Sequence, residues 1–219
     1  MKTADGNGAR FTAASLLVCT ALFGCGQENL VLPPSAETSG ACGAWYPNGE
    51  ADAGDVYAYE EGKTLPCDVF ESARLDGTDT YISVGSLYLD AVHGVSEARS
   101  AVFVISAENC PSCGVLVQEL AAEADRIEAA GAQLFDVTFC DNTDRTDCDF
   151  DLNRAVDAAT AEGWLVDRWP VTNDAEGHLK NLFKDTFPTV IVARLSDIQV
   201  VSVDRVPDAG HLLELLESL

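Results

Sequence analysis

Two cysteines separated by two residues are the part of this sequence best suited to chemistry. Cys110 and Cys113 follow a short apolar run at 101–106 and stand where a helical pattern begins. Thiols at this spacing can close a small disulfide ring, and a cysteine at a helix N-terminus has its thiolate stabilised by free backbone N–H groups and the helix dipole. We therefore expect Cys110 to act as a nucleophile in thiol-disulfide exchange. Cys113, one turn further in, would resolve the mixed disulfide.

The same spacing also occurs in metal and haem sites. The residue after the pair is Gly114 rather than His, which excludes c-type haem attachment. Zinc would need Cys140 and Cys148 as its second ligand pair, but the gap between them is wide for a zinc knuckle. We expect no metal. Two alternatives stay open: a structural disulfide in a non-catalytic binding or assembly module, and, ranked last, a copper-handling protein using thiols as soft ligands.

The hydrophobic pattern predicts the elements that would position this pair. Residues 54–80 are expected to be irregular because they contain several helix and strand breakers. The predicted strands are 81–84, 101–106, 132–139, 169–172, 189–195 and 198–203, and the predicted helices are 87–92, 111–131, 152–162, 176–184 and 208–218. Strands that alternate with helices indicate an α/β fold with helices on both faces of a sheet.

Two motifs resemble the thioredoxin superfamily. Residues 101–113, AVFVISAENCPSC, are similar to its strand and active-site turn, and Phe187-Pro188 opens a segment, FPTVIV, similar to its cis-proline segment. The resemblance implies a thioredoxin-like fold with a central mixed sheet, in which Pro188 is cis and forms with Phe187 a groove for a substrate peptide. The stretch between the motifs resembles the insertion of the TlpA, ResA and redoxin branch. That branch implies a membrane-anchored, extracytoplasmic oxidoreductase that needs no cofactor.

The sequence departs from the family pattern in three places. Asn109 stands where the family usually has Trp, and Val104 stands where thioredoxins keep a buried acidic residue. A proton acceptor for Cys113 must therefore come from elsewhere. Glu108 would oppose a thiolate at Cys110. The run before Cys110 also lacks the proline that the peroxiredoxin branch requires, which disfavours peroxide reduction.

The beginning of the chain has the character of an export signal. Lys2 and Arg10 precede an apolar stretch at 11–24 that is too short to span a bilayer, so we interpret residues 1–24 as a signal peptide. Leu22-Phe23-Gly24-Cys25 resembles the bacterial lipobox and implies lipidation of Cys25; the alternative is ordinary secretion. We expect a lipid-anchored flexible tether at 25–53 and a thioredoxin-like domain at 54–219, with its core at about 78–219. The resemblance implies the periplasmic side of the cell envelope, with the outer membrane as the expected anchor.

Charge and cysteine usage constrain the partners. The chain has 13 basic and 36 acidic residues, a net charge of -23, which disfavours nucleic acid and anionic lipid surfaces. We expect protein thiols and disulfides as substrates, a membrane redox partner, and membrane contact through the lipid anchor only. Of eight cysteines, Cys19 leaves with the signal peptide and Cys25 would carry lipid, so 8 - 2 = 6 remain. Sequence order predicts outer bridges Cys42–Cys67 and Cys140–Cys148.

Overall fold

The segments predicted to flank the cysteine pair form the centre of a seven-stranded mixed sheet. The structure is a computed structural model that describes residues 47, 58–67, 69–73, 80–139, 151–173, 179, 186–205 and 207–219. Strand β3 (Ser100–Ala107) pairs in parallel with β4 (Ala132–Phe139) and antiparallel with β6 (Thr189–Arg194). Every residue of β3 is buried, as expected for a short apolar run in the middle of a sheet. The outer strands are β1 (Val69–Ala73), β2 (Thr80–Ser83), β5 (Val171–Asn173) and β7 (Gln199–Asp204).

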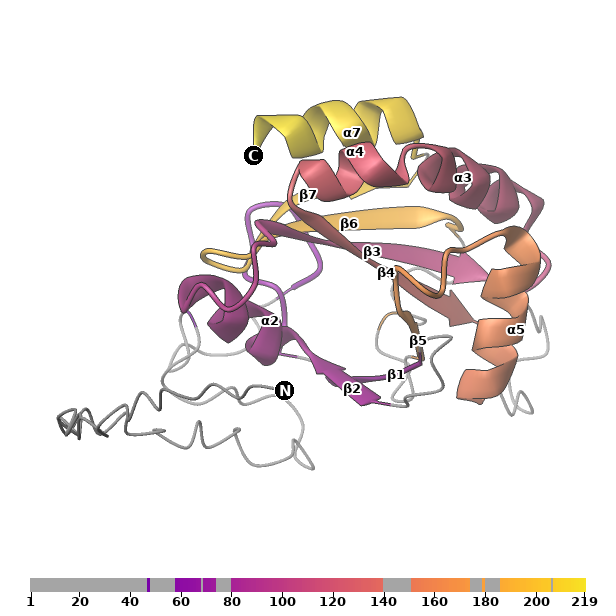
Figure 1. Cartoon of the computed structure of the whole chain (residues 1–219), viewed down its shortest axis with the longest axis horizontal. Coiled ribbons are helices and arrows are strands. Elements are labelled where there is room, and N and C mark those ends of the chain that lie inside the picture. The colour runs from indigo at the N-terminus through magenta and orange to yellow at the C-terminus, as the bar shows by residue number, and fades with distance from the viewer. Residues whose placement is uncertain are drawn as a thin grey trace, which may run out of the picture. The chain divides into compact units, whose positions relative to one another are not determined.

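Helices cover both faces of this sheet, which has the order β2-β1-β5-β4-β3-β6-β7. One face packs against α3 (Pro111–Ala122), α4 (Ala124–Ala129), α5 (Leu152–Glu162) and α7 (Ala209–Ser218). Helix α2 (Val84–Val92) packs against the other face (Figure 1). Each face therefore has its own apolar core, and the predicted α/β thioredoxin-like architecture is confirmed. Among the described residues, no helix is long and apolar enough to cross a membrane.

The boundaries of the helices follow local signals in the sequence. The predicted helix at 111–131 is two helices, because Glu123 leaves the helical conformation with φ -102° and ψ 11° and separates α3 from α4. Helix α5 begins where the Asp151 side chain accepts a hydrogen bond from the Arg154 N–H, and it ends at Gly163 with φ 100°. An N-cap carboxylate and a left-handed C-terminal glycine are common helix boundaries. The predicted helix at 176–184 lies outside the described residues except for Leu179.

The described residues between 54 and 80 are more ordered than predicted. The expectation of an irregular segment is wrong at β1, which pairs antiparallel with both β2 and β5. Before it, residues 58–67 run along the outer edge of β7, where the Leu65 N–H donates to the Ile198 carbonyl and the Val200 N–H donates to the Lys63 carbonyl, both at 2.8 Å. The five residues of β1 show little alternation of apolar and polar side chains, so their strand signal is weak. Pairing with strands from elsewhere in the chain holds them in the sheet.

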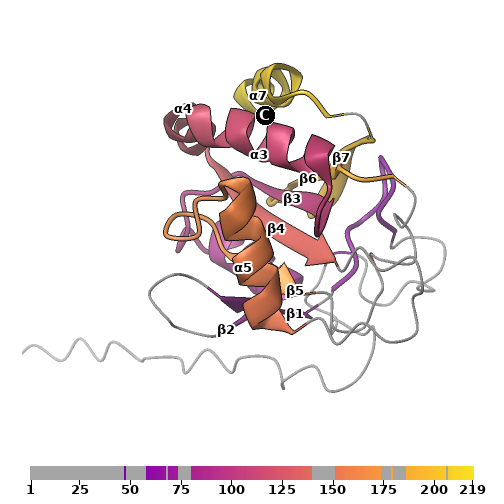
Figure 2. The ribbon, with the colours of Figure 1, turned by 90° about the vertical axis from the view of Figure 1, so that its right-hand side faces the viewer.

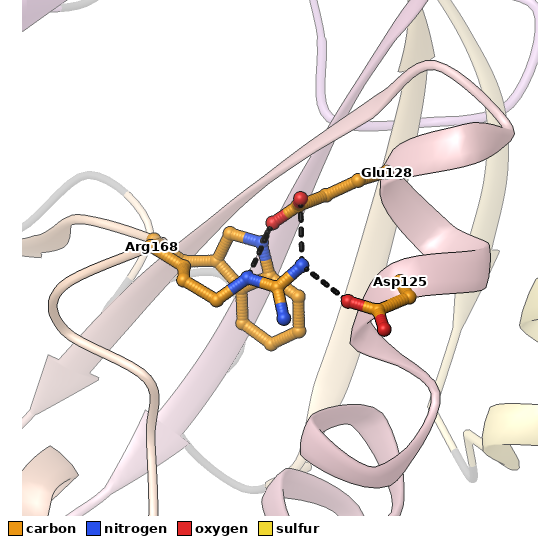
Figure 3. A network of polar contacts seen from close by, with 4 residues as sticks. Asp125, Glu128 and Arg168 are labelled. Carbon is orange, nitrogen blue, oxygen red and sulfur yellow. Dashed lines mark hydrogen bonds and ion pairs between the residues drawn. The ribbon is translucent and has the colours of Figure 1, made fainter.

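A polar network fixes the connection that leads from α5 into β5. Arg168 binds Glu128 of α4 through two nitrogens, at 2.9 and 2.7 Å, and Asp125 at 2.9 Å (Figure 3). The indole N–H of the buried Trp169 also donates to Glu128, at 3.2 Å. The bidentate guanidinium and the indole hold the segment that follows α5 against α4.

Candidate active site

A tight turn carries the chain from β3 to the cysteine pair. The Cys110 N–H donates to the Ala107 carbonyl at 3.1 Å, and the Glu108 N–H donates to the Phe139 carbonyl at 2.7 Å. Asn109 has φ 62°, in the left-handed region that Asn adopts more readily than most residues. Asn109, at the position where thioredoxins usually have Trp, is exposed and adopts a turn conformation.

The two cysteines form a disulfide at the N-terminus of α3. Their Cα atoms are 5.2 Å apart. Cys110 is the N-cap residue, and its sulfur accepts a hydrogen bond from the Cys113 N–H at 3.2 Å. Cys110 is half-buried, Pro111 and Ser112 are exposed, and Cys113 is fully buried. Once the Cys110–Cys113 bond is reduced, a substrate disulfide can reach the sulfur of Cys110 but not the buried sulfur of Cys113. Helix-terminal N–H groups would stabilise a thiolate at the first.

Pro188 lies at the same end of the sheet as the cysteine pair. The Phe187–Pro188 peptide bond is cis. The next residue, Thr189, pairs with Ile105 near the end of β3, so the register places Pro188 close to the turn that carries Cys110. Phe187 is half-buried against the ring of Phe139, with a centroid distance of 5.8 Å. The contribution of Phe187 and Pro188 to a peptide groove stays a prediction.

A guanidinium from α5 neutralises the carboxylate beside Cys110. Arg154 Nη2 lies 2.5 Å from Glu108 Oε2, and Arg154 Nε lies 3.2 Å from Glu108 Oε1. This contact holds the pKa of Arg154 above its ordinary value. The expectation that Glu108 opposes a thiolate at Cys110 must be revised, because the negative charge has a cationic partner from another helix.

A buried carboxyl group lies on β4, near the end of the sheet that carries the cysteine pair. The sequence pattern did not identify it as a site residue. Asp136 on β4 is 1% exposed and pairs with Val104 of β3. Asp136 accepts hydrogen bonds from Ser106 Oγ, at 2.9 Å, and from Thr138 Oγ1. Burial raises the pKa of Asp136 to about 6, although these two hydrogen bonds act in the opposite direction. A single acidic residue inside an apolar strand pattern was the signal available.

A second carboxyl group lies between α3 and α5. Glu162 is half-buried at the last position of α5. A methyl group added at Gly114 would contact Glu162 Cγ at 3.8 Å, so this side chain lies against α3 one residue past Cys113. Burial, and after it the charge of Asp136, raise the pKa of Glu162 to about 7. Two acidic groups close to the cysteine pair thus have pKa values near neutrality.

Several predicted site residues cannot be placed. Cys25, Cys42, Cys140 and Cys148 lie outside the described residues. Cys67 is disulfide-bonded. The pairings Cys42–Cys67 and Cys140–Cys148, and the lipidation of Cys25, stay predictions.

Comparisons with known proteins identify the fold. No family model matches the chain, and no curated protein matches its sequence. The solved structures that resemble it include the 2-Cys peroxiredoxin of Plasmodium vivax (TM-score 0.53, 9% identity, 73% of this chain and 81% of that one), AhpC of Enterococcus faecalis (0.52, 14%, 72% and 90%), and a putative protein disulfide isomerase of Bacteroides thetaiotaomicron (0.50, 13%, 73% and 87%). The chain therefore has the thioredoxin fold.

Proposed function

We propose that this protein is a thiol-disulfide oxidoreductase that exchanges disulfides with other proteins through Cys110 and Cys113. The observation that carries the proposal is the asymmetry of the pair. One sulfur is partly accessible at a helix N-terminus, and its partner is fully buried one turn away. A disulfide that served packing alone would not need one accessible sulfur at the position that best stabilises a thiolate.

The exchange proceeds in two steps that balance. In the reducing direction, the Cys110 thiolate attacks one sulfur of a substrate disulfide, forms a mixed disulfide and releases the other substrate sulfur as a thiolate, which takes up a proton. Cys113 then loses its proton and attacks Cys110. The second substrate thiolate leaves, and the Cys110–Cys113 bond forms. The substrate is reduced by two electrons and the protein is oxidised by two, so no cofactor is needed.

The TlpA and ResA resemblance extends the proposal to location. We place the protein on the periplasmic side of a bacterial envelope, held by lipid on Cys25, with a membrane redox partner to renew its dithiol or disulfide. The support is the signal-like leader, the lipobox-like sequence and the even number of remaining cysteines. A mature chain that begins at Cys25 and carries the mass of attached lipid would support this location. An unmodified Cys25 in the exported protein would contradict the anchor.

A redox equilibrium tests the oxidoreductase proposal. The chain without its leader, with Cys25→Ser in place of the lipid anchor, would be equilibrated in graded glutathione or dithiothreitol buffers, alkylated and mapped by mass spectrometry. We expect the Cys110–Cys113 bond to open before any other bridge. A potential of about -270 mV would indicate a reductase, and one of about -120 mV an oxidant. If the bond opens no more readily than the other bridges, or only on unfolding, the disulfide is structural and a binding role replaces the enzyme.

A further inference from the structure

The resolving step leaves one chemical requirement unmet. Cys113 must lose a proton before it can attack Cys110, yet its side chain is fully buried and has no direct access to water. Burial in apolar surroundings disfavours a thiolate. The family position for a nearby acid holds Val104, which is itself completely buried. A proton acceptor must therefore lie on another element packed against this end of α3.

Asp136 occupies such a position. It pairs across the parallel strands with Val104, so both side chains point to the sheet face that α3 covers. β3 ends at Ala107 and α3 begins at Pro111, returning over that same face with Cys113 as its first buried residue. Asp136 thus lies one strand away from Val104, on the sheet face that this helix covers.

Glu162 lies against α3 at Gly114, the residue that follows Cys113. Helix α5 lies beside α3 over β4 and β5 (Figure 2), and its last residue contacts α3 at Gly114. The Arg168 network fixes the segment that follows, so this position is held by packing on both sides. Because Glu162 is half exposed, it can pass a proton to water, which the buried Asp136 cannot do directly.

The charges around the two carboxyl groups, in the part of the chain that the structure describes, set how these groups take up protons. The charge of Asp136 acts on Glu162, and no lysine or arginine in the described part of the chain shifts either group. Arg154, the cation on α5, is bound to Glu108 instead. Besides Arg154, the other titratable groups on α3, α5, β3, β4 and β5 are Cys113, the exposed Glu119 of α3 and the exposed Asp157 of α5, and the hydroxyls of Ser106 and Thr138 donate to Asp136. Because the charge of Asp136 raises the pKa of Glu162, the protonation of one group is coupled to that of the other.

We propose that Asp136 and Glu162 form a coupled carboxyl pair that accepts the proton of Cys113 when the disulfide closes and returns a proton to it when the disulfide opens. During closure, the Cys113 S–H bond breaks, its proton moves to the pair, and the sulfur forms its bond with Cys110. The leaving thiolate takes a proton from solvent, and Glu162 later releases the stored proton to solvent. This role rests on the proposed oxidoreductase function.

The pH dependence of disulfide closure tests the pair. The reduced chain, with Cys25→Ser, would be mixed with oxidised glutathione, which Cys110 converts into a mixed disulfide. Closure releases glutathione and would be followed from pH 5 to 9 by acid quench and mass spectrometry. Asp136→Asn, Glu162→Gln and the double variant would be compared with wild type. Asp157→Asn and Glu119→Gln, both at exposed positions, are the matched controls.

We expect closure at pH 7 to be at least about tenfold slower in Asp136→Asn and Glu162→Gln, with the acid limb of the rate profile moved to higher pH. The double variant should be little slower than the worse single variant, because the two groups act as one unit. The controls should follow wild type. Glu162→Gln, at a half-exposed helix end, keeps the test valid if Asp136→Asn folds poorly.

Two different results would overturn this inference, and the same assay tells them apart. If wild type closes and both carboxyl variants close with the same rate profile, the pair plays no part, and the oxidoreductase function stands. If wild type forms no mixed disulfide or never closes it, the proposed function fails, and the inference fails with it.

Discussion

Cys110→Ser is expected to lower the rate of protein disulfide reduction by about 10³-fold or more, because the residual hydroxyl is not a nucleophile at neutral pH. In the proposed mechanism the accessible sulfur of Cys110, at the start of α3, makes the first bond to substrate; of the other described cysteines, Cys113 is fully buried and Cys67 is disulfide-bonded. The measurement is turnover of a disulfide-bonded protein substrate with an external reductant, monitored by alkylation.

Cys113→Ser is the matched control for this result. It removes the second sulfur but leaves the first, so it should attack substrate once and accumulate a mixed disulfide that can be trapped and identified. The pattern expected is loss of turnover in both variants and a trapped adduct in Cys113→Ser alone. Undiminished turnover in Cys110→Ser would contradict the mechanism.

Asp136→Asn is expected to stabilise the oxidised protein at pH 8 and to have little effect near pH 4. The folded carboxyl group has a pKa of about 6, against 3.8 ordinarily, because it is buried. The folded state therefore binds more protons than the unfolded state in this interval, and wild-type stability falls as the pH rises from about 4 to 6. At 1.36 kcal/mol per pH unit, the cost of the buried charge approaches about 3 kcal/mol above that interval.

Asparagine avoids this cost and can keep one of the two hydrogen bonds that Asp136 accepts, because an amide has one acceptor oxygen. Its side-chain oxygen can accept from Ser106 or Thr138, whose hydroxyls also lie 3.1 Å from each other. Urea unfolding at a series of pH values would measure the difference, with Asp157→Asn as the exposed control. A loss of stability in Asp136→Asn that grows as the pH rises would mean that the fold favours the ionised carboxylate, contrary to the burial of this side chain.

The central elements could be predicted because their signals are local. The apolar run at 101–106 became β3, and the predicted bounds of β4 and α5 match the structure. Each has a continuous apolar or periodic pattern and ends at a clear breaker or cap. The break at Glu123 could not be predicted, since neither a proline nor a glycine marks it.

The carboxyl groups near the disulfide depend on contacts between distant residues. Asp136 follows Cys110 by 26 residues and reaches its place only through the β3–β4 register. The meeting of Glu162 with Gly114, and of Arg154 with Glu108, requires the packing of α5 on α3. The resemblance to thioredoxins indicated that their buried acidic residue is absent at Val104. Only the parallel pairing of β3 with β4 points to the strand that we propose supplies an acidic residue instead.

The segment at 58–67 has a consequence for how the domain meets other chains. Outer strands with unpaired backbone groups can recruit a second chain and start aggregation. Here the Leu65 N–H and the Lys63 carbonyl already occupy the hydrogen-bonding positions of Ile198 and Val200 on the outward side of β7. Residues that precede the thioredoxin-like core thus protect one border of the sheet. If the protein exchanges disulfides with other proteins as proposed, this cover lets a substrate react at the cysteine pair without also pairing its backbone with β7.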